Sequence, residues 1–357
     1  MAEVALDISA ALQQQVVEAY ASKTPLSIRA GNTKAFYGHS VAGEVLDVAA
    51  HAGIVSYEPT ELVLTARAGT PLREIEAVLA AQGQMLACEP PHLGDQATIG
   101  GTVACNLSGP RRAYAGSTRD FMLGCHMLNG KGERLHFGGE VMKNVAGYDA
   151  SRLMCGALGT LGILLDVSLK VLPMPSADMT VVLSVPSIDA ALQQMNQLAG
   201  QTVPLSASAW LQGHLYLRFS GSVGTMNAIK QKQLGDVLEN AAEFWQSVRE
   251  LQHDYFASTQ PLWRIALPQA ASQPDLTGDW LIEWGGAQRW LRTDVAADEI
   301  RTQVAALGGH ATLFAGGNGK TAVFHPLDAG IWRLHQRLKQ AFDPANILNP
   351  GRMYEGL

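Results

Sequence analysis

The stretch that decides the fold runs from Gly94 to Pro173 and reads GDQATIGGTVACNLSGPRRAYAGSTRDFMLGCHMLNGKGERLHFGGEVMKNVAGYDASRLMCGALGTLGILLDVSLKVLP. Glycine makes up ~20% of the part that ends at Gly162, against roughly 7% in an average protein. Apolar runs separate the glycines, so the segment is not a flexible linker. Because glycine loses more backbone entropy on folding than other residues, we expect this backbone to pack closely against something flat and anionic.

Length and composition limit the classes of protein that fit the chain. The chain has 357 residues, which predicts two domains of ~150 residues each. Its 47% hydrophobic and 16% charged residues are typical of a globular protein with a large core. A net charge of -6 argues against a nucleic-acid surface. No apolar run approaches the ~18 residues of a membrane span, and the first residues lack the pattern of a secretory signal. We therefore expect a cytoplasmic location, with any attachment to the inner membrane made through partners.

The cysteines indicate no metal chemistry. Their spacing contains no CxxC pair, so we expect free thiols and neither an iron–sulfur cluster, a structural zinc ion nor any other metal site in this chain. The four cysteines are Cys88, Cys105, Cys125 and Cys155.

Local patterns predict the first elements of the chain. Apolar residues recur at helical spacing from Ile8 to Tyr20, which predicts an opening helix. A short strand over Pro25–Ile28 leads into the polar turn Arg29–Lys34, and alternation over Glu61–Arg67 predicts another strand. The next helix should begin with Thr70 as its N-cap and Pro71 at its first position.

Further along, the segment Asn129–Gly132 separates two apolar runs and predicts a β-hairpin. Alternating apolar residues over Ile163–Val171 predict a last strand, which Pro173 and Pro175 end. All seven tryptophans lie beyond these prolines. We therefore expect a first domain over residues 1–175, a second α+β domain over residues 176–340 and a C-terminal tail over residues 341–357.

Three groups of residues indicate a site. The turn Arg29–Lys34 offers glycine, small polar side chains and a positive charge to a pyrophosphate. The segment Ala97–Cys105 adds the glycine pair, and the runs Lys143–Asp149 and Gly156–Ile163 follow. None of them is a Rossmann or Walker motif. In this order they resemble the FAD-binding domain of the vanillyl-alcohol oxidase or p-cresol methylhydroxylase type. The whole chain is similar to the FAD-binding subunits of bacterial glycolate oxidase complexes.

The resemblance implies an α+β fold. A two-subdomain FAD-binding domain of the p-cresol methylhydroxylase type should be followed by an α+β cap domain, with the C-terminal tail returning to the FAD domain. Covalently flavinylated relatives carry a histidine in the first phosphate loop, whereas the nearest histidine here is His39, so we expect non-covalent FAD. We expect Gly101 to approach the cofactor with a positive φ. The residues expected to contact FAD are Ala30, Gly31, Asn32, Thr33, Lys34, Pro90, Thr98, Gly100, Gly101, Val103, Arg112, Gly159, Gly162 and Ile163.

The resemblance also exposes a missing pair of catalytic groups. Relatives that oxidise 2-hydroxy acids carry a late Glu-His pair at the substrate, and here Phe314 and Ala315 occupy those two positions. Neither side chain can move a proton or bind a metal. His310 lies close by and is either a base or an ordinary core or surface histidine. Arg264 either holds the substrate carboxylate or stacks on a tryptophan at a domain contact.

Three functions remain open on this reading. In the first, the chain is the FAD-binding subunit of a multi-subunit glycolate oxidase, in which a related FAD-binding subunit oxidises glycolate to glyoxylate and an iron–sulfur partner passes electrons to quinone. The flavin of this chain would then carry electrons. In the second, the chain alone is an FAD-dependent 2-hydroxyacid dehydrogenase that uses Arg264 and His310. In the third, it is a non-catalytic assembly subunit with structural FAD.

Overall fold

The computed structural model describes residues 6–139, 150–317 and 321–357, which form two compact units. The first unit contains Met1–Leu107, Ser117–Met174 and Pro326–Leu357. The second contains Ser108–Gly116 and Pro175–His325. No helix within the described ranges has the length and hydropathy to cross a membrane.

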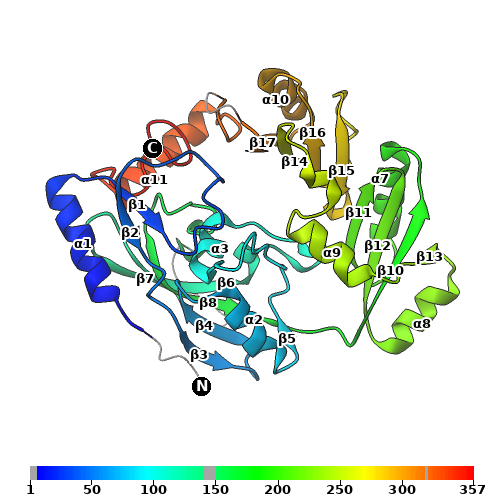
Figure 1. Ribbon diagram of the computed structural model, residues 1–357, viewed down its shortest axis with the longest axis horizontal. Helices are drawn as coiled ribbons and strands as arrows, with labels where there is room; N and C mark the ends of the chain where they lie inside the picture. The colour runs from blue at the N-terminus through cyan, green and yellow to red at the C-terminus, as the bar shows by residue number, and fades with distance from the viewer. Residues whose placement is uncertain (1–5, 140–149, 318–320) are drawn as a thin grey trace. The chain divides into compact units, whose positions relative to one another are not determined.

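The first unit is built on an antiparallel five-stranded sheet in the order β3-β4-β8-β6-β7 (Figure 1). The expected hairpin forms as β6 and β7, with Leu128 opposite Arg134 beside the turn. The expected last strand forms as β8 in the middle of the sheet. Two smaller pairs, the parallel β1-β2 and the antiparallel β5-β9, complete the sheets of the unit. The strands are β1 (Leu26–Arg29), β2 (Glu44–Asp47), β3 (Ile54–Glu58), β4 (Val63–Arg67), β5 (Gln84–Met85), β6 (Met122–Leu128), β7 (Arg134–Gly138), β8 (Ile163–Lys170) and β9 (Leu172–Pro173).

Helices pack around these sheets. The opening helix forms as expected, with Leu12, Val16 and Ala19 as its buried face. The second helix begins at Leu72 with Pro71 at the N-cap, so the expected Thr70 cap is wrong. The Thr70 hydroxyl instead bridges the backbone of Gly53 and Arg67. The helices of the unit are α1 (Ser9–Ser22), α2 (Leu72–Ala80), α3 (Ile99–Cys105), α5 (Thr118–Phe121), α6 (Ala150–Leu153) and α11 (Ala329–Phe342).

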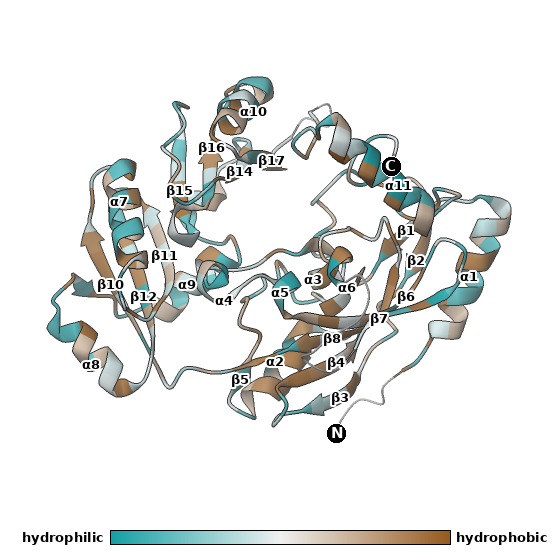
Figure 2. Ribbon diagram, turned by 180° about the vertical axis from the view of Figure 1, so that it is seen from behind, coloured by the Kyte–Doolittle hydropathy of each residue, from teal (hydrophilic) through white to brown (hydrophobic). Residues whose placement is uncertain are grey.

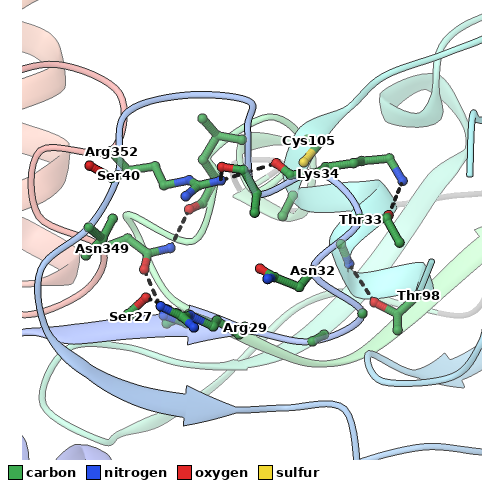
Figure 3. Close-up of a pocket in the computed structure, with 18 residues that line it drawn as sticks. Ser27, Arg29, Asn32, Thr33, Lys34, Ser40, Thr98, Cys105, Asn349 and Arg352 are labelled. Atoms are coloured by element: carbon green, nitrogen blue, oxygen red, sulfur yellow. Dashed lines mark hydrogen bonds between the residues drawn. The ribbon is translucent and has the colours of Figure 1, made fainter. Parts of the chain in front are cut away.

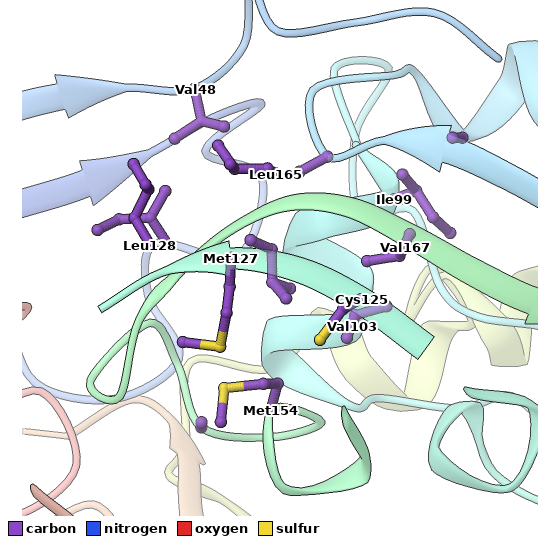
Figure 4. Close-up of a cluster of buried hydrophobic side chains, with 14 of the residues drawn as sticks. Val48, Ile99, Val103, Cys125, Met127, Leu128, Met154, Leu165 and Val167 are labelled. Carbon is purple, nitrogen blue, oxygen red and sulfur yellow. The ribbon is translucent and has the colours of Figure 1, made fainter. Parts of the chain in front are cut away.

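The core of the first unit lies between the five-stranded sheet and its helices. Figure 4 shows Ile99 and Val103 of α3 beside Cys125 and Val167 of the sheet. Apolar colouring runs along β4 and β8 (Figure 2), and most residues of both strands are buried, as in strands that are covered on both faces. This packing fixes α3 against the sheet, and α3 forms one wall of the site described below.

The C-terminal tail belongs to the first unit, as the family resemblance implied. Leu348 bridges Leu26 of β1, and the Leu26 amide donates to the Ile347 carbonyl at 2.7 Å. The Asn349 amide in turn donates to the Leu26 carbonyl at 3.0 Å. The last residues are therefore fixed alongside the first strand of the chain.

The second unit is an antiparallel sheet whose eight described strands follow the order β13-β10-β12-β11-β15-β16-β14-β17. Its strands are β10 (Ala177–Ser184), β11 (Leu205–Leu211), β12 (His214–Gly221), β13 (Asp236–Val237), β14 (Leu262–Ala266), β15 (Asp279–Glu283), β16 (Gln288–Arg292) and β17 (His310–Ala315). Its helices are α4 (Arg112–Ala115), α7 (Ile188–Ala199), α8 (Val223–Gln231), α9 (Ala241–Arg249) and α10 (Ala297–Ala306), with the short 3₁₀ turns η1 (Asp254–Ala257) and η2 (Trp284–Gly286).

The division into units differs from the expected domain boundaries in two places. Residues 326–340, expected in the second domain, pack with the first unit. Residues 108–116, expected in the first domain, pack with the second. A physical reason for the second difference lies in Trp284, whose buried indole N–H donates to the Gly109 carbonyl at 3.0 Å. Glycine-rich sequence alone therefore does not mark where one unit ends.

Candidate functional site

Two cavities share a wall in the first unit. One is polar and has a volume of about 270 Å³, and the other is largely apolar and has a volume of about 100 Å³. They adjoin between the end of β1, helix α3 and the turn before β8. The residues that line both are Ile28, Arg29, Ala30, Gly101, Ala104, Leu158 and Asn349. This shared wall makes the two cavities one elongated site.

The polar cavity is bordered by the turn that follows β1 (Figure 3). Residues 30–34, which the sequence reading expects at the cofactor, all line it. Lys34 and Thr33 are fixed by hydrogen bonds to the His92 carbonyl, at 3.0 Å from Nζ and 2.8 Å from Oγ1. Gly31 lies so close to the Gln96 carbonyl that an added Cβ would be 1.5 Å from its oxygen. Only glycine therefore lets this turn pack against the segment before α3.

Helix α3 contributes the opposite wall. Thr98 caps the helix, and its hydroxyl accepts a hydrogen bond from the Gly101 amide at 3.3 Å. A Cβ at Gly100 would be 2.6 Å from the Cβ of Ala68, so Gly100 allows the helix to approach β4. A Cβ at Gly101 would meet only the Thr98 hydroxyl, at 3.2 Å.

This geometry corrects one expectation about Gly101. The residue lies inside α3 with helical backbone and does not have a positive φ. Glycine matters at this position because Gly101 lines both cavities, and any larger residue would occupy space within them. The site thus has a bare stretch of helix as one wall.

The C-terminal tail supplies two lining residues that the sequence reading missed. The Asn349 side chain joins the two walls, since its Oδ1 accepts from the Ile28 amide at 2.8 Å and its Nδ2 donates to the Leu158 carbonyl at 2.7 Å. The Arg352 guanidinium lines the polar cavity and donates to backbone carbonyls of the loop after β1. The turn-rich run Phe342–Arg352 was the available signal, but its contact with β1 depends on the tertiary fold.

The polar cavity is rich in positive charge. Arg29, Lys34 and Arg352 all line it. Burial lowers the pKa of Arg352, and neighbouring Arg29 lowers it further. Cys105, which the sequence reading also missed, lines the same cavity from α3. Burial raises the pKa of its thiol, although Lys34 and Arg352 oppose that shift. An anionic group such as a pyrophosphate suits this lining.

The apolar cavity is lined by the residues that the sequence reading expects around the turn before β8. Gly159, Gly162 and Ile163 line it together with Met154 and Leu164. A Cβ at Gly162 would be 2.8 Å from the backbone carbonyl oxygen of Leu128, so this glycine is needed for packing on β6. The small apolar wall suits a flat ring. The expected motif Lys143–Asp149 lies outside the described residues.

Three expected cofactor contacts lie elsewhere. Pro90 is buried and lines neither of the two cavities. Val103 is fully buried in the core, and its carbonyl accepts from the Gly156 amide at 3.0 Å. Arg112 belongs to the second unit, where its guanidinium stacks on the Trp284 ring at 4.5 Å from the centroid. The side chains of Val103 and Arg112 therefore have contacts within the protein.

Arg264, the candidate for binding a carboxylate, lies on β14 of the second unit. Its Nε donates to the Gln288 side chain at 2.6 Å, and its guanidinium lies 5.3 Å from the Trp284 ring centroid. Gln288 donates in turn to buried Glu283 at 2.9 Å, and the Trp290 indole donates to the same carboxylate at 2.8 Å. The tryptophan stacking weighed from the sequence is therefore present, and Arg264 belongs to a buried polar network.

His310 begins β17, and its side chain is exposed. His310 pairs with Ala266 of β14, and Thr312, two residues further along β17, pairs with Arg264. Partial desolvation, Arg264 and His325 all lower the pKa of His310. Phe314 is buried and packs edge-to-face on Trp290 at 5.0 Å between centroids. At the two positions where the resemblance led us to expect a Glu-His pair, Phe314 therefore makes an aromatic contact and Ala315 is exposed.

Comparisons with known families agree with the two-part reading. A family model described as "FAD binding domain" matches residues 3–138. A second, described as "FAD linked oxidases, C-terminal domain", matches residues 238–353. The second match spans both β17 and the tail residues Asn349 and Arg352.

Curated relatives fall into full-length and partial matches. "Glycolate oxidase subunit GlcE" of Escherichia coli (strain K12) is 49% identical over 351 residues, which cover 98% of this chain and 99% of that protein. "Glycolate oxidase subunit GlcD" of Bacillus subtilis (strain 168) is 30% identical over 152 residues, 42% of this chain and 32% of that protein. Among solved structures, an alkyldihydroxyacetonephosphate synthase aligns with a TM-score of 0.64 at 15% identity, covering 95% of this chain and 74% of its own. That likeness supports the expected fold alone.

Proposed function

The chain belongs to the GlcE family of glycolate oxidase subunits, and from this premise we propose that it is the FAD-binding, electron-carrying subunit of a glycolate oxidase complex. The FAD-binding family match and the 49% identity to a full-length GlcE carry the oxidoreductase assignment and the cofactor. The observation that carries the role within the complex is the contrast between a formed cofactor pocket and the absence of a proton-transfer pair at Phe314 and Ala315.

The residues of the pocket fit FAD. Arg29, Lys34 and Arg352 supply positive charge where a pyrophosphate would lie, and the bare surface at Gly101 leaves room for a flat group. The apolar wall around Gly159 and Ile163 suits a ring system. When bound, FAD supplies two-electron and one-electron redox chemistry. The protein residues orient it and set the charge around it.

We propose that FAD is held without a covalent bond. Among the described residues that line the two cavities there is no histidine, and His39 is not one of them. Acid precipitation of the purified chain should therefore release all of the flavin into the supernatant. Yellow colour that stays with the precipitated protein would contradict this.

We further propose the partners of the complex. A related FAD-binding subunit, of the kind named GlcD in relatives, should oxidise glycolate to glyoxylate, because it would supply the acid–base pair that Phe314 and Ala315 replace here. An iron–sulfur subunit should pass the electrons on to quinone. The complex should lie in the cytoplasm, held at the inner face of the membrane through these partners.

The test is a deletion and reconstitution. Cells that lack this chain but keep both proposed partners should lose glycolate-dependent reduction of an artificial acceptor, and the wild-type chain should restore it. A chain expected to bind no flavin, Gly31→Ala, should assemble and fail to restore activity. Full activity without the chain would remove it from the reaction. Restoration by the flavin-free variant would support the assembly-subunit alternative.

A further inference from the structure

A buried ion pair lies behind the cofactor pocket. Lys339 on the last turns of α11 and Asp343 just beyond the helix are 6% and 1% exposed. The Lys339 Nζ is 2.8 Å from the Asp343 Oδ2. Burial lowers the pKa of Lys339, and the adjacent carboxylate opposes that shift. Because removing two charges from water is costly, such a pair is weak evidence for stability by itself.

Lys339 and Asp343 also form hydrogen bonds with the backbone of two other segments. The ammonium group donates to the Thr160 carbonyl at 2.9 Å and to the Leu348 carbonyl at 2.7 Å, so all three of its protons have acceptors. The Asp343 carboxylate accepts from the amides of Ile347 and Leu348, at 3.1 and 2.7 Å. The pair therefore ties the turn before β8 to the C-terminal tail.

Both of these segments form the pocket. Leu348 immediately precedes Asn349, and Thr160 lies two residues after Leu158, whose carbonyl accepts the Asn349 side chain. Asn349 and Leu158 line both cavities. Gly159 approaches the same amide, since an added Cβ would be 2.8 Å from the Asn349 Nδ2. Small displacements of either segment would therefore change the width of the site.

We propose that Lys339 is a positioning residue for FAD: its three hydrogen bonds hold the tail and the turn before β8 so that Asn349 bridges the pocket walls. This inference rests on the proposed function, in that FAD is the ligand. It adds that affinity for FAD depends on an ammonium group that lines neither cavity. An apolar residue of similar length would fill the space without holding either carbonyl.

The experiment measures FAD affinity and stability separately. Apoprotein of the wild type, Lys339→Met and Lys339→Gln is titrated with FAD at a temperature at which circular dichroism shows each to be folded. We expect Lys339→Met to raise the Kd about 10- to 100-fold, by analogy with the loss of affinity when outer-shell partners of metal ligands are removed. Lys339→Gln keeps two N–H donors and should recover part of the loss. Leu12→Ala is the matched control, because it removes buried core of the same unit away from the pocket.

A double variant distinguishes positioning from general destabilisation. If Lys339 acts through Asn349, the Kd of Lys339→Met combined with Asn349→Ala should equal that of Asn349→Ala alone. Multiplying effects would contradict the proposal. So would a wild-type Kd in both Lys339 variants, or an equal rise in Leu12→Ala. A wild-type chain that binds no FAD would instead overturn the proposed function, and the two failures are distinct. Should Lys339→Met not fold, Lys339→Gln and the corresponding double variant decide the question.

Discussion

The two units of the molecule place their arginines differently. In the first unit, the polar cavity is lined by Arg29, Lys34 and Arg352. In the second, Arg112 and Arg264 both lie over the ring of Trp284, and Arg264 is bonded further to Gln288. In the first arrangement, Lys34 and Arg352 are fixed by backbone carbonyls at the edge of a cavity that a ligand can enter. The second satisfies positive charge with aromatic and amide groups of the protein itself.

Of the two units, only the first has the lining of a ligand site at these positions. The first unit has glycines where side chains would occupy the site or collide with its wall, as at Gly101 and Gly31. At the positions where the family resemblance led us to expect an acid–base pair, the second unit has packing instead, as the contact of Phe314 with Trp290 shows. A subunit that binds a flavin but does not oxidise the substrate would have this combination.

The largest expected effect comes from Gly31→Ala. The new Cβ would lie 1.5 Å from the Gln96 carbonyl oxygen, so the turn after β1 must move away from α3. We expect a purified chain without bound FAD, measured as the ratio of flavin to protein absorbance. Gly83→Ala is the control, because Gly83 has a positive φ but no atom within 4 Å of an added Cβ. Full flavin content in Gly31→Ala would contradict the placement of the loop.

Gly101→Val should have a smaller but still clear effect. Overfilling a packed site costs about 1–3 kcal/mol, roughly 5- to 150-fold in Kd, so FAD should bind far more weakly. The fold should remain, since the added Cβ meets only the Thr98 hydroxyl. Titration of the apoprotein with FAD measures the change. Gly224→Val on α8 is the control in the second unit, and unchanged affinity in Gly101→Val would mean that the cofactor lies elsewhere.

His310→Ala should change the activity of the complex little. Loss of a general base would lower turnover about 10²–10⁴-fold, whereas we expect a change within about two-fold. Glycolate-dependent dye reduction by the assembled complex is the measurement, with flavin content as the check on assembly. A large loss at normal flavin content would assign the base to this chain and support the stand-alone dehydrogenase.

The smallest effect is on stability against pH. Because partial desolvation, Arg264 and His325 lower the pKa of His310, the unfolded chain binds its proton first as the pH falls. Folding stability should therefore decrease as the pH drops below about 6.5, the ordinary pKa of histidine. Thermal melting of the wild type and His310→Gln between about pH 7.5 and 5 checks this, and the variant should show the shallower dependence. An identical dependence would mean that His310 contributes nothing to it.

Much of the first unit could be predicted from sequence because its signals are local. The polar turn at residues 29–34, the glycine pair at Gly100 and Gly101 and the alternation over β8 each depend on neighbouring residues. Asn349 and Arg352 could not be placed in the pocket, since their contacts with Ile28 and the loop after β1 span about three hundred residues of chain. The cap at Pro71 was misassigned because Thr70 found backbone partners at Gly53 and Arg67.

The second unit was harder to read for a related reason. Arg112 sits in a glycine-rich segment whose sequence suggested phosphate binding, yet Trp284, far along the chain, holds that segment in the other unit through the Gly109 carbonyl. The sequence left two roles open for Arg264, binding a substrate carboxylate or stacking on a tryptophan. In the structure its guanidinium lies over the ring of Trp284. Which residues a side chain meets across a fold is decided by packing that local patterns do not encode.

The most direct test of the central claim follows the flavin of the isolated chain by visible absorption without oxygen. Excess glycolate should leave the oxidised spectrum of the isolated chain unchanged over the turnover time of the complex. Addition of the related GlcD-type subunit should then bleach it. Bleaching of the isolated chain by glycolate at the rate of the complete complex would contradict the account, because the chain would then oxidise the substrate itself.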